Sequence, residues 1–434
     1  MKNSMQWVST LSTRPSLEAA VGEVVEQARQ KLRDRADLGI IFISSAFLSD
    51  FSRLLPLLQE KLSLPVLIGC GGGGIVGTSS TDQVTEIEAG AALSLTLAHL
   101  PGVEVNSFHI NTDALPDLDG PPDRWVDLVG VAPQERPQFV LLASPFASGI
   151  NDLLQGLDYA YPQSVKVGGL TSVVSTGSQS GLFLNHQLIQ GGVVGVALSG
   201  NVVLDTIVAQ GCRPIGDLCQ VVEGDRNIII SVQNQPGPGN PSVQPPLEVL
   251  QNLVTTLSPE DRELAQSSLS IGIAQSEFKP KLEQGDFLIR TLMGVDPRQG
   301  AIAIGDRVRP GMRIQFHLRD AHTSIEDLEG LLQRYLKDSA QADSTPIGTL
   351  MFACIGRGQS LYEKPNVDSE LLRRYLPSLP LSGFFCNGEI GPVGGTTFIH
   401  GFTSVFGIVR QPHDVAPDRS TALDDVSNLG NSDD

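Results

Sequence analysis

Three segments of the chain repeat one pattern, and this repetition constrains the fold more than any other feature. Each has a short apolar run ending in a small residue, then a segment of helical character, then a second apolar run that reaches a glycine. The first runs end at Ser45, Ser144 and Cys354, and the glycines are Gly69, Gly168 and Gly383. They are separated by 24 residues in the first two segments and by 29 in the third. Such self-similarity indicates a repeated supersecondary unit, so we expect the first runs to be equivalent strands and the glycines to begin equivalent loops.

A loop and a hairpin pattern follow each second run, so the repeated unit is strand, helix, strand, loop and hairpin. Apolar residues at helical spacing predict helices over residues 17–32, 51–61, 150–159, 325–337 and 368–376. The expected fold is α/β, with two tandem halves in which mixed β-sheets are flanked by helices. Strands that end together leave a crevice at one edge of the sheet, which is where α/β proteins bind ligands.

Charge and cysteine content exclude several classes of function. The 434 residues carry a formal net charge of −18, which opposes binding to nucleic acid or to an anionic membrane surface. No secretory signal pattern begins the sequence, and apolar runs such as residues 191–199 fall short of the roughly 18 residues of a membrane span. Five cysteines without regular spacing indicate free thiols in a reducing compartment. We therefore expect a soluble, cytoplasmic protein.

Several motifs resemble those of the FIST family, whose name stands for F-box and intracellular signal transduction. Residues 383–395, continuing into residues 400–403, are similar to the C-terminal FIST signature, as are residues 352–358 and 315–320. The segments at Gly69-Cys70 and residues 211–216 are similar to the N-terminal FIST domain.

This resemblance implies an N-terminal FIST domain over residues 1–222 and a C-terminal FIST domain over residues 223–411. Residues 412–434, rich in Asp and Ser, are expected to form a disordered acidic tail. FIST domains are suggested to bind small ligands such as amino acids, and family members are often fused to output domains or, in animals, to an F-box. No segment outside the two halves is long enough for an output domain, so the resemblance implies a separate signalling partner.

The glycine run over residues 69–77 invites comparison with a phosphate-binding loop. It lacks the Gly-Lys-Ser/Thr ending and no helical pattern follows it, so the nucleotide interpretation fails. The run instead indicates a tight loop whose backbone, at Gly71 and Gly72, could approach a ligand.

Cys70, Cys354 and Cys386 each fall near the end of an apolar run. As a nucleophile, Cys354 or Cys386 would need a base and an oxyanion site, for which His400 and the amides of Asn387 and Gly388 are the candidates. Small buried residues filling crowded strand ends explain the cysteines equally simply, and no Cys-x-x-Cys pair suggests zinc. We expect no cofactor and no metal site, and a binding protein rather than an enzyme.

Three arginines lie in or beside apolar strands, where a guanidinium is costly without a partner. Arg290, Arg319 and Arg357 have Asp296, Asp320 and Glu389 as candidate structural partners. Alternatively, Arg357 and Glu389 could read the two charged ends of an amino acid, because arginine binds carboxylates with two parallel hydrogen bonds.

The predicted function is binding of a small polar metabolite, with the signal passed to a separate partner protein. A cysteine-dependent enzyme and a protein-interaction scaffold are the alternatives. The predicted ligand-binding residues are Gly71, Gly72, Cys354, Arg357, Cys386, Asn387, Gly388 and Glu389.

Overall fold

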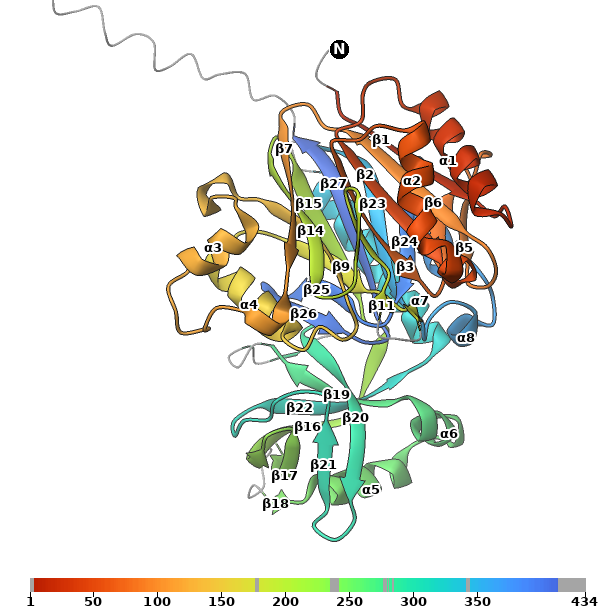
Figure 1. Ribbon diagram of the computed structural model, residues 1–434. Helices are drawn as coiled ribbons and strands as arrows, with labels where there is room; N and C mark the ends of the chain where they lie inside the picture. The colour runs from red at the N-terminus through yellow and green to blue at the C-terminus, as the bar shows by residue number, and fades with distance from the viewer. Residues whose placement is uncertain are drawn as a thin grey trace, which may run out of the picture.

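The computed structural model describes residues 4–175, 179–234, 242–275, 279, 281–282, 285–340 and 344–412 (Figure 1). The predicted tail lies, apart from Pro412, outside the described residues. The helical and strand content confirms the expected α/β class, with mixed sheets flanked by helices. The predicted domain boundaries at residues 222 and 411 stay a prediction.

Three six-stranded sheets form the larger part of the molecule, which we call the body. The first sheet has the order β1(Gln6–Ser12), β6(Leu93–His99), β2(Leu38–Ser44), β3(Val66–Gly72), β12(Leu182–Leu184) and β13(Gln187–Ile189). The second has the order β26(Thr396–His400), β25(Glu389–Val393), β9(Lys166–Leu170), β8(Gln138–Ala143), β14(Val193–Gly200) and β7(Val103–Ile110). The third has the order β15(Val203–Ala209), β27(Ser404–Pro412), β23(Ser344–Cys354), β24(Leu381–Cys386), β4(Ile75–Thr78) and β5(Val84–Ile87). A separate short ribbon joins β10(Val174–Ser175) to β11(Gln179–Ser180).

The sheets exchange their hairpins in a cycle. Each sheet is built on one parallel pair, β2–β3, β8–β9 or β23–β24, which confirms that the first runs of the repeats are equivalent strands. The hairpin β4–β5 follows β3 but pairs with β24, and β12–β13 follows β9 but pairs with β3. The hairpin β25–β26 follows β24 and pairs with β9, which closes the cycle. Each unit thus contributes its hairpin to the sheet of another unit.

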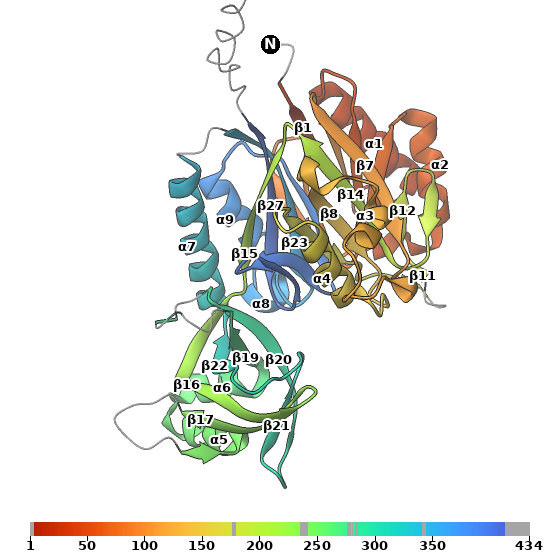
Figure 2. The same ribbon diagram turned by 90° about the vertical axis from the view of Figure 1, so that its left-hand side faces the viewer.

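Helices cover the outer faces of the sheets, and the inner faces share one core (Figures 1 and 2). The central core contains Phe42, Phe352 and Phe384, whose ring centroids lie 5.1–6.5 Å apart. Helix α1 begins after Ser16, whose side chain accepts a hydrogen bond from the Ala19 N–H, and buries an apolar stripe on the first sheet. The covering helices are α1(Leu17–Lys31), α2(Phe51–Lys61), α3(Asp123–Val129), α4(Ile150–Ala160), α7(Ala321–Ser339) and α9(Val367–Tyr375). Shorter helices are η1(Ser45–Asp50), η2(Thr112–Ala114), η3(Pro133–Glu135) and α8(Gln359–Tyr362).

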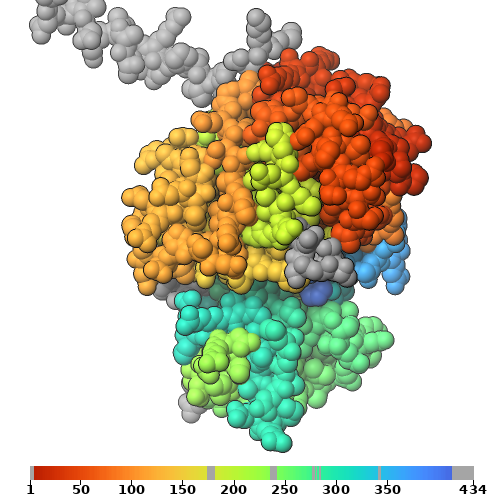
Figure 3. Space-filling view, in the orientation of Figure 1, coloured from red at the N-terminus to blue at the C-terminus, as the bar shows by residue number. Residues whose placement is uncertain are grey.

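A second, smaller unit interrupts the third repeat between β15 and α7. Its sheet has the order β16-β22-β19-β20-β21-β17-β18, and β16 also pairs with β17, so the sheet closes into a barrel. The barrel lies below the body in the view of Figure 3. Its elements are β16(Cys212–Asp225), β17(Ile228–Asn234), β18(Val243–Gln244), α5(Pro246–Thr256), α6(Pro259–Ser268), β19(Leu269–Ala274), β20(Phe287–Asp296), β21(Ala301–Ile304) and β22(Arg313–Arg319).

The repeated glycines have equivalent positions, but they do not begin loops. Gly69, Gly168 and Gly383 lie inside β3, β9 and β24, opposite Ile41, Leu141 and Met351 of the parallel neighbour. A Cβ at any of the three would overlap the backbone oxygen of that opposite residue. The three glycines therefore mark the places where two parallel strands approach closely. Each strand continues past its glycine.

We expect Gly383→Ala to lower the free energy of unfolding by about 1–3 kcal/mol, because backbone atoms must move to admit the methyl group. Gly22→Ala is the matched control, since a Cβ at Gly22 in α1 meets no atom within 4 Å. That substitution should raise stability by about 0.5–1 kcal/mol. Urea unfolding of both variants measures the difference, and equal effects would contradict the steric explanation.

Among the described residues, no helix is long and apolar enough to cross a membrane.

Candidate functional site

The carboxyl ends of β3, β9 and β24 meet at one place in the body. The Gly73 N–H donates to the Ser172 Oγ at 2.6 Å, and the Asn387 N–H donates to the Leu170 carbonyl at 2.9 Å. Gly73, Ser172 and Asn387 each lie four residues beyond the repeated glycine of their unit. The three strand ends therefore converge as the repeats predict. We call Gly73, Ser172, Cys354, Asn387 and Glu389 the strand-end cluster.

Glu389 is a charged residue type at a position that is apolar in the other two units. It lies opposite Gly169, as Ile75 lies opposite Phe384 and Leu182 lies opposite Cys70. Gly169, Phe384 and Cys70 each follow a repeated glycine directly, so Glu389, Ile75 and Leu182 occupy equivalent sites. Ile75 and Leu182 belong to the central core, and Glu389 is fully buried.

The Glu389 carboxyl group is only half satisfied. Its Oε2 accepts a hydrogen bond from the Thr403 N–H at 3.1 Å. The neighbouring Cys354 thiol, a weak donor, interacts with the carboxyl, but no N–H or O–H group among the described residues reaches Oε1. Burial raises the pKa of this carboxyl well above its ordinary value. A buried oxygen without a partner is costly, so the fold alone does not account for a glutamate at this position.

Cys354 lies beside Glu389 at the end of β23 and is 8% exposed. Burial, reinforced by Glu389, raises the pKa of its thiol to about 11, while the backbone N–H groups of Gly356 and Phe402 oppose the shift. Cys386 is fully buried, and burial raises its pKa well above the ordinary value. These environments favour protonated thiols over the thiolate that a nucleophile requires.

His400 and the Asn387 amide do not form the catalytic arrangement considered for the cysteines. The His400 Nε2 hydrogen-bonds the Gly391 carbonyl at 3.0 Å, and burial lowers the pKa of the ring to about 4. The Asn387 N–H is bonded to Leu170, so it does not face a thiol as an oxyanion donor.

Arg357 does not pair with Glu389 and is not exposed at a strand end. Its guanidinium is fully buried and binds the Asp368 carboxylate through two hydrogen bonds, of 2.7 and 2.9 Å. It also donates to the Tyr362 hydroxyl and to the Phe402 carbonyl. Arg357 therefore holds the loop before Thr403 in place, and contact with a ligand would require it to leave Asp368.

The other two candidate ion pairs do not form either. Arg290 binds Asp306 at 2.6 Å instead of Asp296. Arg319 stacks on the Phe402 ring, with its Cζ 3.6 Å from the ring centroid, while Asp320 caps α7 and binds Arg213. Because β22 belongs to the barrel, the Arg319–Phe402 stack joins the barrel to the loop that contacts Glu389.

The predicted glycine contacts differ in their surroundings. Gly71 and Gly72 are buried in β3, where a Cβ would meet Phe51 and Phe384, so they do not form the predicted loop. Gly388 is also buried. Asn387 is exposed, and Gly73 is the first partly exposed residue of the glycine run.

The sequence prediction missed Ser172, Thr403 and Asp368. Ser172 could have been found, because it occupies the position of Asn387 in the second repeat. Thr403 and Asp368 left no such signal, because their roles depend on which elements pack together.

Comparison with known proteins matches two models of one family to the chain, in tandem. The FIST N domain matches residues 37–235 and the FIST C domain matches residues 246–392. An uncharacterized protein of Mycobacterium tuberculosis is 32% identical over 395 residues, which cover 91% of this chain and 97% of that protein. Human F-box only protein 22 is 48% identical over 64 residues, or 14% of this chain and 15% of that protein. An F-box/LRR-repeat protein of Arabidopsis thaliana is 30% identical over 155 residues, or 32% of this chain and 28% of that protein.

Proposed function

The chain belongs to the FIST family, whose domains act in signal transduction, and from this premise we propose that it is a cytoplasmic sensor of a small polar metabolite. The metabolite, an amino acid or a related compound, binds at the strand-end cluster, and the signal passes to a separate partner protein. The observation that carries the proposal is the half-satisfied Glu389 carboxyl group at a site where the other units have Ile75 and Leu182.

The polar groups around Glu389 suit a compact ligand with several hydrogen-bonding atoms. In this proposal Glu389 Oε1 supplies the buried contact and the Asn387 side chain an exposed one. Gly388 belongs to the framework, because a Cβ there would already meet Ile399 at 3.1 Å. Cys354 and Cys386 form the apolar floor. Arg357, Gly71 and Gly72 act through the framework in this proposal, since each is packed against protein groups.

We expect Glu389→Leu to abolish ligand binding without loss of stability. Leucine is the residue that the first sheet has at the equivalent site, so the core accepts its shape. Removing a buried, unpartnered oxygen should raise the free energy of unfolding by about 1–3 kcal/mol. This gain offsets the loss of the hydrogen bond from the Thr403 N–H. The measurement is a thermal-shift screen of amino acids, nucleotides and small organic acids on the whole chain, followed by calorimetry of each hit on wild type and variant.

Glu389→Gln is the second arm, because it keeps an acceptor for the Thr403 N–H but cannot carry a charge. Binding that survives in this variant and fails in Glu389→Leu shows that the ligand needs a hydrogen-bonding group. Unchanged affinity in Glu389→Leu would contradict the site, and a screen with no stabilising compound would contradict the sensor function.

A further inference from the structure

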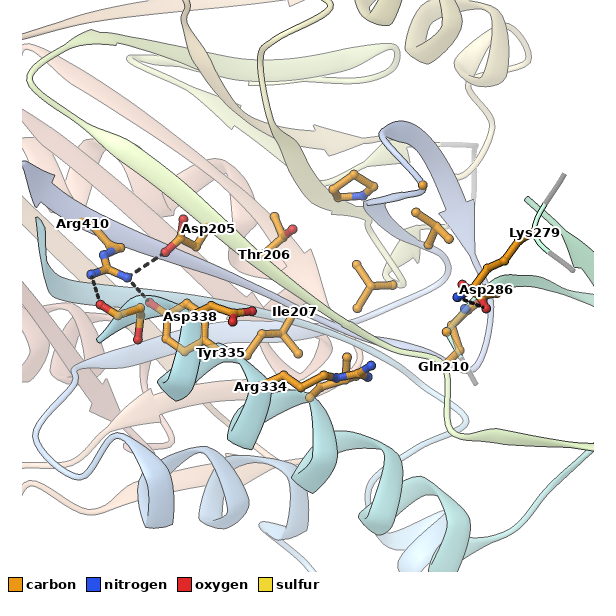
Figure 4. A pocket seen from close by; sticks show the side chains of 17 residues that line it. Asp205, Thr206, Ile207, Gln210, Lys279, Asp286, Arg334, Tyr335, Asp338 and Arg410 are labelled. Carbon is orange, nitrogen blue, oxygen red and sulfur yellow. Dashed lines mark hydrogen bonds and ion pairs between the residues drawn. The ribbon is translucent and has the colours of Figure 1, made fainter. Parts of the chain in front are cut away.

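A groove with an internal volume of about 580 Å³ lies on the side of the body next to the barrel. Its walls are β15, the second half of α7, the turn between β25 and β26, and Lys279, Gly285 and Asp286 of the barrel. Figure 4 shows Arg410, Tyr335 and Asp205 together at one end, and Lys279, Asp286 and Gln210 at the other. The groove shares no lining residue with the strand-end cluster.

Two arginines offer unused donors to this groove. Arg334 lines it from α7, is exposed, and makes no hydrogen bond or ion pair with any described residue. Arg410 is 2% exposed, and its two terminal nitrogens bind Asp205, Tyr335 and backbone carbonyls. Its Nε is buried without a partner. A buried guanidinium nitrogen without an acceptor beside a cavity indicates a missing hydrogen-bond acceptor.

The remaining charges limit the ligand to a single anionic group. Arg410 binds Asp205 at 3.1 Å and Lys279 binds Asp286 at 2.7 Å, so these two carboxylates are neutralised in place. Asp338 also lines the groove and would repel a second negative charge.

The floor of the groove favours polar, uncharged groups on the rest of the ligand. β15 is the outermost strand of the third sheet and pairs only with β27 there. Alternate backbone N–H and C=O groups on its outer edge therefore have no strand partner in that sheet. Hydroxyl or amide groups of a ligand could bond to them, and the volume is that of an ordinary small-molecule site.

We propose that this groove binds a small organic acid, with its one carboxylate or phosphate group held by Arg334 and with an uncharged polar body that runs along β15 toward the Arg410 Nε. Lys279, Gly285 and Asp286 of the barrel line the same groove, so the bound acid lies between the body and the barrel. The proposal does not depend on the sensor function at the strand-end cluster.

The test is calorimetry on the whole chain at low, constant ionic strength with lactate and glycerate as carboxylate probes and inorganic phosphate and glycerol phosphate as phosphate probes. We expect saturable binding by one of the two classes. Arg334→Gln should weaken that binding about 10-fold or more, since it removes a charge-assisted contact. Arg334 is exposed, so this variant should fold as the wild type does.

Arg373→Gln is the matched control. Arg373 lines a second groove, of about 470 Å³, between β1 and the β4–β5 hairpin, and it makes no ion pair or hydrogen bond with a described residue. This second groove occupies the equivalent junction of two sheets but has no barrel wall. Affinity that falls with Arg334→Gln and not with Arg373→Gln supports the proposal. Equal effects of the two variants, or no saturable binding of either carboxylate or phosphate probes, would overturn the proposal. Glu389→Leu should leave binding of these probes unchanged.

Discussion

Arg357→Ala is expected to lower the free energy of unfolding by about 3–5 kcal/mol, which is the usual cost of removing one partner from a buried ion pair. Asp368 is 1% exposed and would be left without its guanidinium partner. The Phe402 carbonyl would lose a donor at the same time. Urea unfolding followed by tryptophan fluorescence reports on the body, which contains Arg357. The chain has two tryptophans, Trp7 and Trp125, and both lie in the body.

Arg374→Ala is the control for charge removal at a neighbouring position. Arg374 binds Glu329 at 3.2 Å, but its side chain is 64% exposed, so its loss should change stability by less than about 1 kcal/mol. If Arg357→Ala instead weakened ligand binding and left stability unchanged, Arg357 would contact the ligand directly, and its pairing with Asp368 would not be its main role.

The repeats were predictable because a close contact between two strands requires a glycine at a fixed place in the sequence. Gly69, Gly168 and Gly383 are required by the backbone of a neighbouring strand, and the helices before them carry regular apolar spacing. The exchange of hairpins was not predictable, because pairing between β4 and β24 joins residues about 300 positions apart without any local signal. Closure of the barrel depends in the same way on the pairing of β16 with β17 and β22.

Part of the candidate site was predictable from the sequence because it lies at equivalent positions of the repeats. The convergence of Gly73 and Asn387 follows from the repeat, and the repeat also marks Glu389 as the exceptional residue once Ile75 and Leu182 are aligned with it. The partner of Arg357 could not be read from the sequence, because the choice between Asp368 and Glu389 depends on where α9 packs.

Glu86 is expected to make the protein less stable as the pH rises. Burial, reinforced by Asp368, raises the pKa of its carboxyl from 4.5 to about 7. The folded state therefore binds more protons than the unfolded state between these two values, and stability falls as pH rises through this window. Glu86→Gln cannot titrate, so its stability relative to wild type should rise by about 3 kcal/mol from pH 4.5 to pH 8. Urea unfolding of both proteins at a series of pH values measures this difference.

Glu88→Gln is the control, because Glu88 lies two residues away in the same acidic region. Its pKa is also raised by burial, but Glu88 is much less buried than Glu86 and accepts the Gln359 N–H through both oxygens. Its pH dependence should follow the same sign with a smaller amplitude. Glu86 accepts the Ser369 N–H through Oε1, and its Oε2 has no partner among the described residues. That unpartnered oxygen is free to carry the proton below pH 7, so equal pH profiles for wild type and Glu86→Gln would show that Glu86 is ionised and solvated in the folded protein.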